Sequence, residues 1–153
     1  MRLYVVRHGL ARSKAEDPER SLNEQGITET ERLATRLKPL GLKVDTIYHS
    51  GKARARGTAE IISQVVESAN GVKQRDGLNP NDDVHKFAHE LDKIDGDTMI
   101  AGHLPFVGKI VSLLVTGEAD ANLVNFEASA MACLKSNDNG RWIILWMVVP
   151  GIL

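Results

Sequence analysis

Three short segments in the first two-thirds of the chain, of which the first is apolar throughout, are each followed by polar residues. They cover Leu3–Val6, Val44–Tyr48 and Asp97–Ala101. Each run is too short for a stable helix and lacks the regular alternation of a half-exposed strand. The pattern therefore predicts strands that are buried on both faces of a parallel sheet.

Amphipathic stretches separate these runs and predict helices. The first begins near Gly26, and Pro39 ends it because proline cannot continue a helix. The second has apolar residues from 55 to 69 at spacings of four and three, which form one stripe before Asn70-Gly71 closes it. Two further helices are predicted at 84–91 and 105–117, and residues 72–83 are predicted to be irregular.

The last part of the chain has a different pattern. Two apolar runs, Ser129–Leu134 and Trp142–Val149, are joined by a segment with Asn139-Gly140, which is typical of a hairpin. The second run predicts a strand buried on both faces. We therefore expect a single α/β domain over residues 1–153, a three-layer sandwich with a mostly parallel sheet, helices on both faces and a C-terminal antiparallel hairpin.

Composition excludes several classes of partner. The 153 residues have a net charge of -1, so no global field favours nucleic acid or a membrane surface. The one cysteine, Cys133, cannot form an internal disulfide and suits a reducing compartment. No signal peptide is recognised, and the longest apolar run is too short to span a bilayer. We expect a cytoplasmic protein, a monomer or weak dimer, with no cofactor and no metal.

Polar residues follow all three buried strands at the point where each ends. Arg7 and His8 follow the first strand, His49 and Ser50 the second, and His103 the third. Ligands of parallel α/β sheets bind at the carboxyl ends of the strands. The sequence therefore predicts a functional site at this edge.

These residue types suit a phosphoryl group. Arg7 offers a planar fork of donors, and a neutral His8 offers a nucleophilic ring nitrogen. Gly9 would let a ligand approach the backbone. Arg54, or alternatively Arg56, could reach back from the second helix. A protonated His103 could stabilise the transferring group, although it could instead cap the following helix.

Two other patterns do not indicate sites. His85 and His89 have the i, i+4 spacing of zinc ligands, but no glutamate lies between them and no third ligand is evident, which favours exposed surface. GHLPFVGK differs in spacing from a P-loop and has Ile110 where serine or threonine is needed.

Four segments together resemble the histidine phosphatase superfamily, which has a phosphoglycerate mutase-like fold. They are VVRHG, SLNEQG before a helix, HSGKARARGTAEI and IAGHLPFVG. RHG alone is a weak signal, but with an S-x-x-x-R-A-x-x-T-A-E run and a late GH it is specific. The short chain and the GHLPFVG form are most similar to SixA-type phosphohistidine phosphatases, which act on bacterial phosphorelay domains. The resemblance covers almost the whole chain.

The resemblance implies a role for each matching residue. His8 would be the nucleophile, and Arg7 would bind the phosphoryl oxygens. Arg54 matches the family arginine, which favours it over Arg56. His103 would be the second histidine at the phosphoryl group, and Arg20 would line the mouth of the site.

The chain departs from the family pattern in two places. Gly51 stands where the family usually has proline after the serine, and no glutamate matches the general acid of larger members. Asp82 or Asp83 could donate the proton. Phosphohistidine needs such an acid less than an alkyl phosphate does, because its imidazole leaves readily once protonated.

The implied function is metal-independent phosphatase activity, on a phosphoric monoester or a phosphoramidate, through a covalent phosphohistidine intermediate. A phosphohistidine-containing signalling protein is the expected substrate, because the loops predict an open site. The alternatives are a phosphatase of small phosphate esters and a non-catalytic phosphate-binding module.

Overall fold

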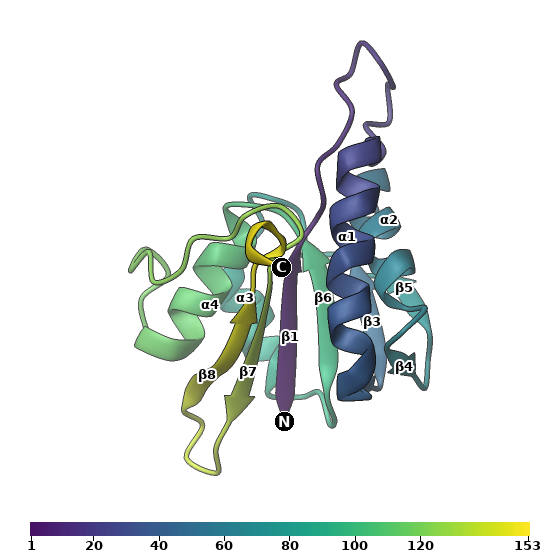
Figure 1. Cartoon of the computed structure of the whole chain (residues 1–153). Helices are drawn as coiled ribbons and strands as arrows, with labels where there is room; N and C mark the ends of the chain where they lie inside the picture. Colours follow the sequence, from purple (N-terminus) through teal and green to yellow (C-terminus); the bar gives the residue numbers. More distant parts are fainter.

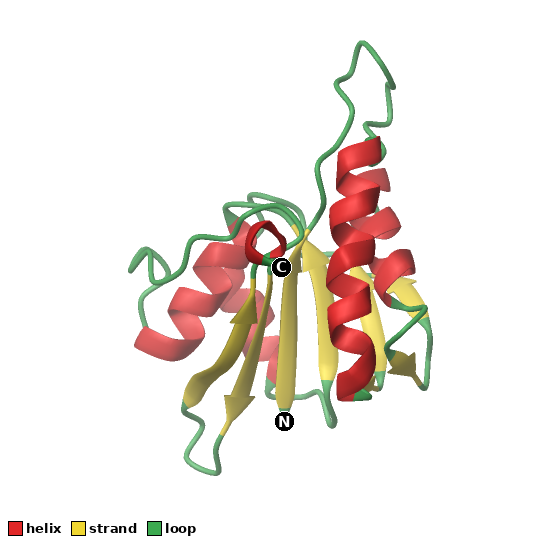
Figure 2. Ribbon diagram, viewed as in Figure 1, coloured by secondary structure: helices red, strands yellow, loops and turns green.

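The computed structural model describes residues 1–153. Helices cover both faces of one six-stranded sheet (Figures 1 and 2). The elements in chain order are β1 Arg2–Arg7, α1 Glu24–Leu37, β2 Lys43–Val44, β3 Thr46–His49, α2 Ala53–Ile62, β4 Glu67–Ser68, β5 Val72–Gln74, α3 Val84–Leu91, β6 Thr98–Gly102, α4 Phe106–Thr116, β7 Met131–Ser136 and β8 Trp142–Val148, with short 3₁₀ turns η1 at Lys38–Leu40 and η2 at Pro150–Ile152.

The strand order is β5-β3-β6-β1-β7-β8. The first four strands in this order are parallel, whereas β7 runs antiparallel to β1 and β8 antiparallel to β7. This arrangement confirms the predicted fold class, including the C-terminal hairpin. It also places the carboxyl ends of β1, β3 and β6 at one edge of the sheet.

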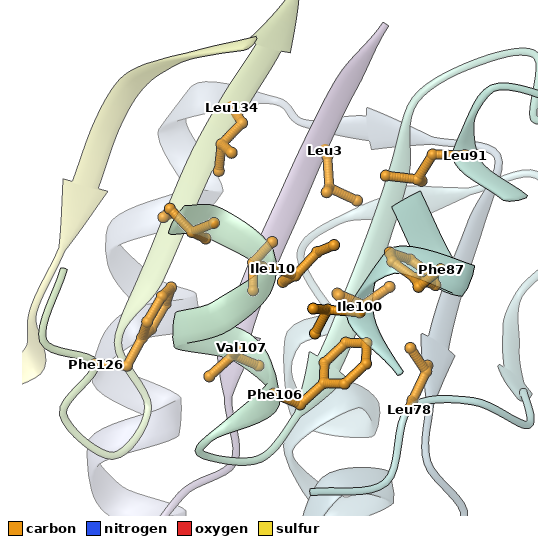
Figure 3. Packing of buried hydrophobic residues seen from close by; sticks show 14 of the residues in the cluster. Leu3, Leu78, Phe87, Leu91, Ile100, Phe106, Val107, Ile110, Phe126 and Leu134 are labelled. Atoms are coloured by element: carbon orange, nitrogen blue, oxygen red, sulfur yellow. The ribbon is translucent and has the colours of Figure 1, made fainter. Parts of the chain in front are cut away.

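Two hydrophobic clusters hold the three layers together, one on each face of the sheet. Leu3 and Val5 of β1 belong to the cluster under α3 and α4, in which Phe87 and Phe106 meet edge to face (Figure 3). Tyr4 and Val6 point to the other cluster, under α1 and α2. Consecutive side chains of a strand point to opposite faces, so β1 is apolar throughout because both of its faces are buried.

The predicted helix over residues 55–69 is too long. Helix α2 ends at Ile62, and Val66 stays buried in a turn rather than on a helix. Val65 and Val66 are β-branched, which weakens helical continuation. The chain then forms β4, which pairs with β2, and β5 at the edge of the main sheet, so the segment predicted to be irregular from residue 72 begins with a strand.

The predicted burial of the last strand is also wrong. Ile143 and Leu145 are 54% and 39% exposed, because β8 is the outermost strand of the sheet.

Smaller differences between the predicted and observed elements occur at two boundaries. Asp45 separates β2 from β3 within the predicted 44–48 strand, and α1 begins two residues before Gly26, where the Asn23 side chain accepts a hydrogen bond from the Gly26 N–H. None of the helices has both the length and the apolar character needed to cross a membrane.

Candidate active site

The pairing of β1 with β6 brings two distant histidines together. Arg7 lies opposite Gly102 in this parallel pair, so His8 and His103 leave the sheet on adjacent strands. The His8 N–H donates to the Gly102 carbonyl at 2.8 Å, which continues the pairing by one residue. The two ring centroids are 5.0 Å apart, with 54° between the ring planes. The register of two strands therefore builds the centre of the site.

The surroundings of His8 leave one ring nitrogen free to react. Its Nδ1 lies 2.7 Å from the Gly9 carbonyl oxygen, which can only accept, so Nδ1 carries the proton and donates. Burial, with smaller contributions from the nearby arginines Arg54, Arg7 and Arg20, lowers the pKa of His8 to about 4. The ring is therefore neutral at neutral pH, and the lone pair lies on Nε2.

His103 is buried and held by a serine. Its Nε2 lies 2.6 Å from the Ser50 hydroxyl at the end of β3. Burial, followed by the charges of His8, Arg54 and Lys52, lowers the pKa of His103 to about 3. His103 is therefore neutral at neutral pH in this structure, and its protonation beside a phosphoryl group stays a prediction.

Arg7 is anchored beside these rings. Its Nη1 donates to the Phe126 carbonyl at 2.8 Å. Three buried side-chain nitrogens of the chain have no hydrogen-bond partner, and two of them are Arg7 Nε and His103 Nδ1. Buried polar atoms in proteins are nearly always paired. Two unpaired buried nitrogens at the same place are typical of a site that binds a polar ligand.

The two candidate arginines of α2 have different surroundings. Arg54, on the first turn, is half-buried, and its charge lowers the pKa of both His8 and His103. Arg56 is exposed and lies 3.8 Å from Glu60. The structure therefore brings Arg54, and not Arg56, to the two histidines.

Arg20 also lies near the histidines. It belongs to a loop of residues 10–23 that projects beyond the carboxyl ends of the strands (Figure 1). Its charge contributes to lowering the pKa of His8 and of Arg54. Its Nε donates to the Arg12 carbonyl, and its backbone has a positive φ of 52°. This placement agrees with a position at the mouth of the site.

Gly9 has a different purpose from the one expected. A Cβ at this position would lie 2.8 Å from the Thr30 hydroxyl and 3.0 Å from the Gly26 carbonyl. Protein atoms already fill the space beside Gly9, so the glycine allows the segment that follows β1 to pack against α1. The expectation that it admits a ligand is corrected by this packing.

The two candidate acids are engaged in local structure. Asp82 accepts a hydrogen bond from the Asn79 N–H, and Asp83 caps α3 by accepting from the His85 N–H. Neither carboxylate is among the charges that shift the pKa of His8 or His103. A role for either as proton donor therefore stays a prediction.

On α3 itself, His85 and His89 are exposed, as the sequence indicated.

Three contacts at the site were not predicted. Ser50 was predicted at the site edge and belongs to the S-x-x-x-R-A motif, but its contact with His103 was missed. Thr58, in the same motif, accepts from the Gly9 N–H and donates to the Arg54 carbonyl, and so joins α2 to the end of β1. The motif itself could have indicated both residues. The Phe126 carbonyl could not be found from sequence, because any residue offers a carbonyl.

Comparisons with known proteins identify the family of this chain. The model of the histidine phosphatase superfamily (branch 1) matches residues 3–80, just over half of the 153 residues. An uncharacterized protein of Picosynechococcus sp. is 32% identical over 143 residues, which cover 89% of this chain and 86% of that protein. Phosphohistidine phosphatase SixA of Escherichia coli is 26% identical over 155 residues, which cover 98% and 94% of the two chains.

Solved structures extend the similarity to the whole fold. The structure of the protein histidine phosphatase SixA complexed with tungstate has a TM-score of 0.85 at 25% identity and covers 99% of both chains. An alpha-ribazole phosphatase from Shigella flexneri shares the fold at 14% identity, with a TM-score of 0.77 over 98% of this chain and 97% of the other. By the family match and the 32% identity, this chain belongs to the histidine phosphatase superfamily.

Proposed function

We propose that this chain dephosphorylates phosphohistidine on a signalling (phosphotransfer) protein, through a covalent intermediate on His8 and without a metal cofactor. The family and its SixA relatives support phosphatase activity. The observation that carries the proposal is the state of His8, a half-buried neutral imidazole whose Nε2 is free and whose neighbours include Arg7 and Arg54.

In the first step, His8 Nε2 attacks the phosphorus of the substrate. The bond between phosphorus and the substrate imidazole breaks, and the electron pair leaves with that ring. The substrate ring reacts in the form that solvent has protonated on its other nitrogen, so the group that leaves is a neutral imidazole. Negative charge spreads over the phosphoryl oxygens in the transition state, and Arg7 and Arg54 supply the compensating positive charge.

In the second step, water attacks the phosphorus of phosphorylated His8. The bond from phosphorus to Nε2 breaks, inorganic phosphate leaves with the oxygen and both protons of the water, and His8 regains its lone pair. The low pKa of His8 favours this step, because a weakly basic imidazole is the better leaving group.

The surroundings of the acidic residues support phosphohistidine over an alkyl ester. An alkoxide leaving group needs a proton from a placed acid. Asp82 and Asp83 are occupied with backbone N–H groups, and no carboxylate acts on the two site histidines. A substrate with a good leaving group suits such a site.

The experiment compares a phosphotransfer domain phosphorylated on histidine with an alkyl phosphate, each with and without EDTA. We expect faster release of phosphate from phosphohistidine, no inhibition by EDTA, and a trapped phosphoenzyme whose label is stable to alkali and lost in acid, as for a phosphorus–nitrogen bond. Faster hydrolysis of the alkyl phosphate would favour the small-ester alternative. Binding of phosphate without turnover of either substrate would favour the phosphate-binding module.

A further inference from the structure

We propose that a basic groove beside the site, defined by Lys14, Arg20, Lys52, Arg54 and Arg56, binds acidic side chains that surround the phosphohistidine of a partner protein. The inference rests on the proposed function and names the surface chemistry of its substrate. The groove is lined by residues of the projecting loop 10–23 and by residues at the start of α2.

The groove is continuous with the site. Arg20 and Arg54 line the groove and act on His8, and Lys52 lines it and acts on His103. A protein whose phosphohistidine reached His8 would therefore lay its adjoining surface along these cations. The cations of the groove would therefore affect the binding of the partner as well as the transfer of the phosphoryl group.

The positive charge of the groove is not neutralised by the chain. Glu19 is the only carboxylate that lines it, against five cations, although the whole chain has a net charge of -1. Of the five cations, only Arg56 has a carboxylate within 4 Å, and that contact is long, at 3.8 Å between two exposed side chains. Such a local excess attracts acidic partners and speeds their association.

Asp17 of the projecting loop does not neutralise the groove, because its carboxylate is engaged within the loop. The Asp17 carboxylate accepts hydrogen bonds from the N–H groups of Glu19 and Ser21 and from the Ser21 hydroxyl. A bridge between Ala11 and Leu22 closes the base of the loop. The loop is thus internally tied, and Arg20 is held at the groove by its bond to a carbonyl of the same loop.

The lining favours a protein over a small molecule. One of the nine lining residues is hydrophobic, whereas small-molecule sites are concave and mostly apolar. The exposed cations Lys14, Lys52 and Arg56 instead fit a rim contact between proteins, in which charge sets association rate and specificity. The occupant is therefore an acidic protein surface, and a small polyanion is the competing outcome.

The test uses two synthetic peptides, each with one phosphohistidine, flanked in one by glutamates and in the other by glutamines. Wild-type protein should have about tenfold higher kcat/KM for the glutamate peptide at low salt, and the preference should shrink at high salt. The Lys14→Glu/Arg56→Glu variant should lose the preference and keep the wild-type rate on free phosphohistidine. The matched control, Lys93→Glu/Lys135→Glu, reverses two exposed cations at the opposite edge of the sheet and should keep the preference.

Three results would overturn the groove. They are no preference in the wild type, a preference that survives in Lys14→Glu/Arg56→Glu, and an equal loss on free phosphohistidine, which would make the groove part of a small-substrate site. Failure of the proposed function is distinguishable, because wild-type protein would then release no phosphate from either peptide or from free phosphohistidine.

Discussion

Two pairs of histidines show how differently the same side chain is used in this molecule. His85 and His89 are four residues apart on α3, and both are exposed to solvent. His8 and His103 are far apart in the sequence, yet their ring centroids are 5.0 Å apart at the edge of the sheet. The i, i+4 spacing of His85 and His89 can be seen in the sequence. His8 and His103 come together through the register of β1 and β6.

The surroundings of the second pair change its chemistry. Burial and neighbouring cations lower the pKa of His8 to about 4 and that of His103 to about 3. Both rings then stay neutral where an unperturbed histidine would be partly charged. A reactive histidine is thus produced by its environment, and the largest experimental contrast should lie between the two pairs.

The largest expected effect is that of His8→Asn. Loss of the nucleophile should reduce kcat on phosphohistidine by about 10⁴-fold or more. The matched change His89→Asn, on the exposed pair, should leave kcat unchanged. Steady-state phosphate release measures both. Substantial activity of His8→Asn would exclude covalent catalysis at this residue.

A second contrast separates the two arginines of α2. Arg54→Ala removes a charge that acts on both histidines and should lower kcat/KM for free phosphohistidine by about 10²–10³-fold. Arg56→Ala should change this value less than about twofold, because an exposed pair such as Arg56–Glu60 contributes little. Equal losses in the two variants would show that the choice between these arginines is wrong.

Features that depend on one short segment of the chain could largely be predicted from the sequence. The apolar runs predicted β1 and β6, and polar residues at their ends predicted the edge that holds His8 and His103. The choice of Arg54 over Arg56 came from the family motif, because both arginines lie near the start of one helix and spacing alone left the alternatives open.

Features that depend on distant packing were missed. Strand β5 exists through its pairing with β3, and its three residues have no strand pattern of their own. The exposure of β8 follows from its place at the end of the strand order, which a one-dimensional pattern does not contain. The Gly9 contact with α1 and the Phe126 carbonyl at Arg7 are of the same kind.

Gly9 therefore gives a test of packing behind the site. Gly9→Ala places a methyl group against the Thr30 hydroxyl and the Gly26 carbonyl, and should lower the free energy of unfolding by about 1–3 kcal/mol. Gly108→Ala is the matched control within α4. Its Cβ would lie 3.7 Å from Leu104, and alanine should stabilise the helix by about 0.5–1 kcal/mol. Urea unfolding measures both, and an unchanged stability of Gly9→Ala would contradict the packing role.

A smaller effect is expected for the residue that holds the second histidine. Ser50→Ala removes the 2.6 Å contact to His103 Nε2 and should lower kcat by about tenfold, with KM nearly unchanged, as for loss of one hydrogen bond that positions a catalytic group. Ser112→Ala removes another buried hydroxyl, which accepts from the Leu123 N–H, and should leave kcat unchanged. A loss in KM alone for Ser50→Ala would assign the serine to substrate binding.

The smallest change should appear in the pH profile, which tests the environment of the buried pair directly. Protonation of Nε2 removes the nucleophile, so kcat/KM should fall only as pH drops towards the pKa of His8, about 4. Folding lowers the pKa of both His8 and His103, so their contribution to stability is complete above the unfolded value and is lost as pH falls through about 4 and about 3. Because the charge of Arg54 lowers the pKa of His8, Arg54→Gln should move the acid limb to higher pH, whereas Arg56→Gln should not. The two variants are compared on one substrate, so that titration of the substrate phosphoryl group cancels. A wild-type limb at the pH of an exposed histidine would mean that His8 is not buried during turnover.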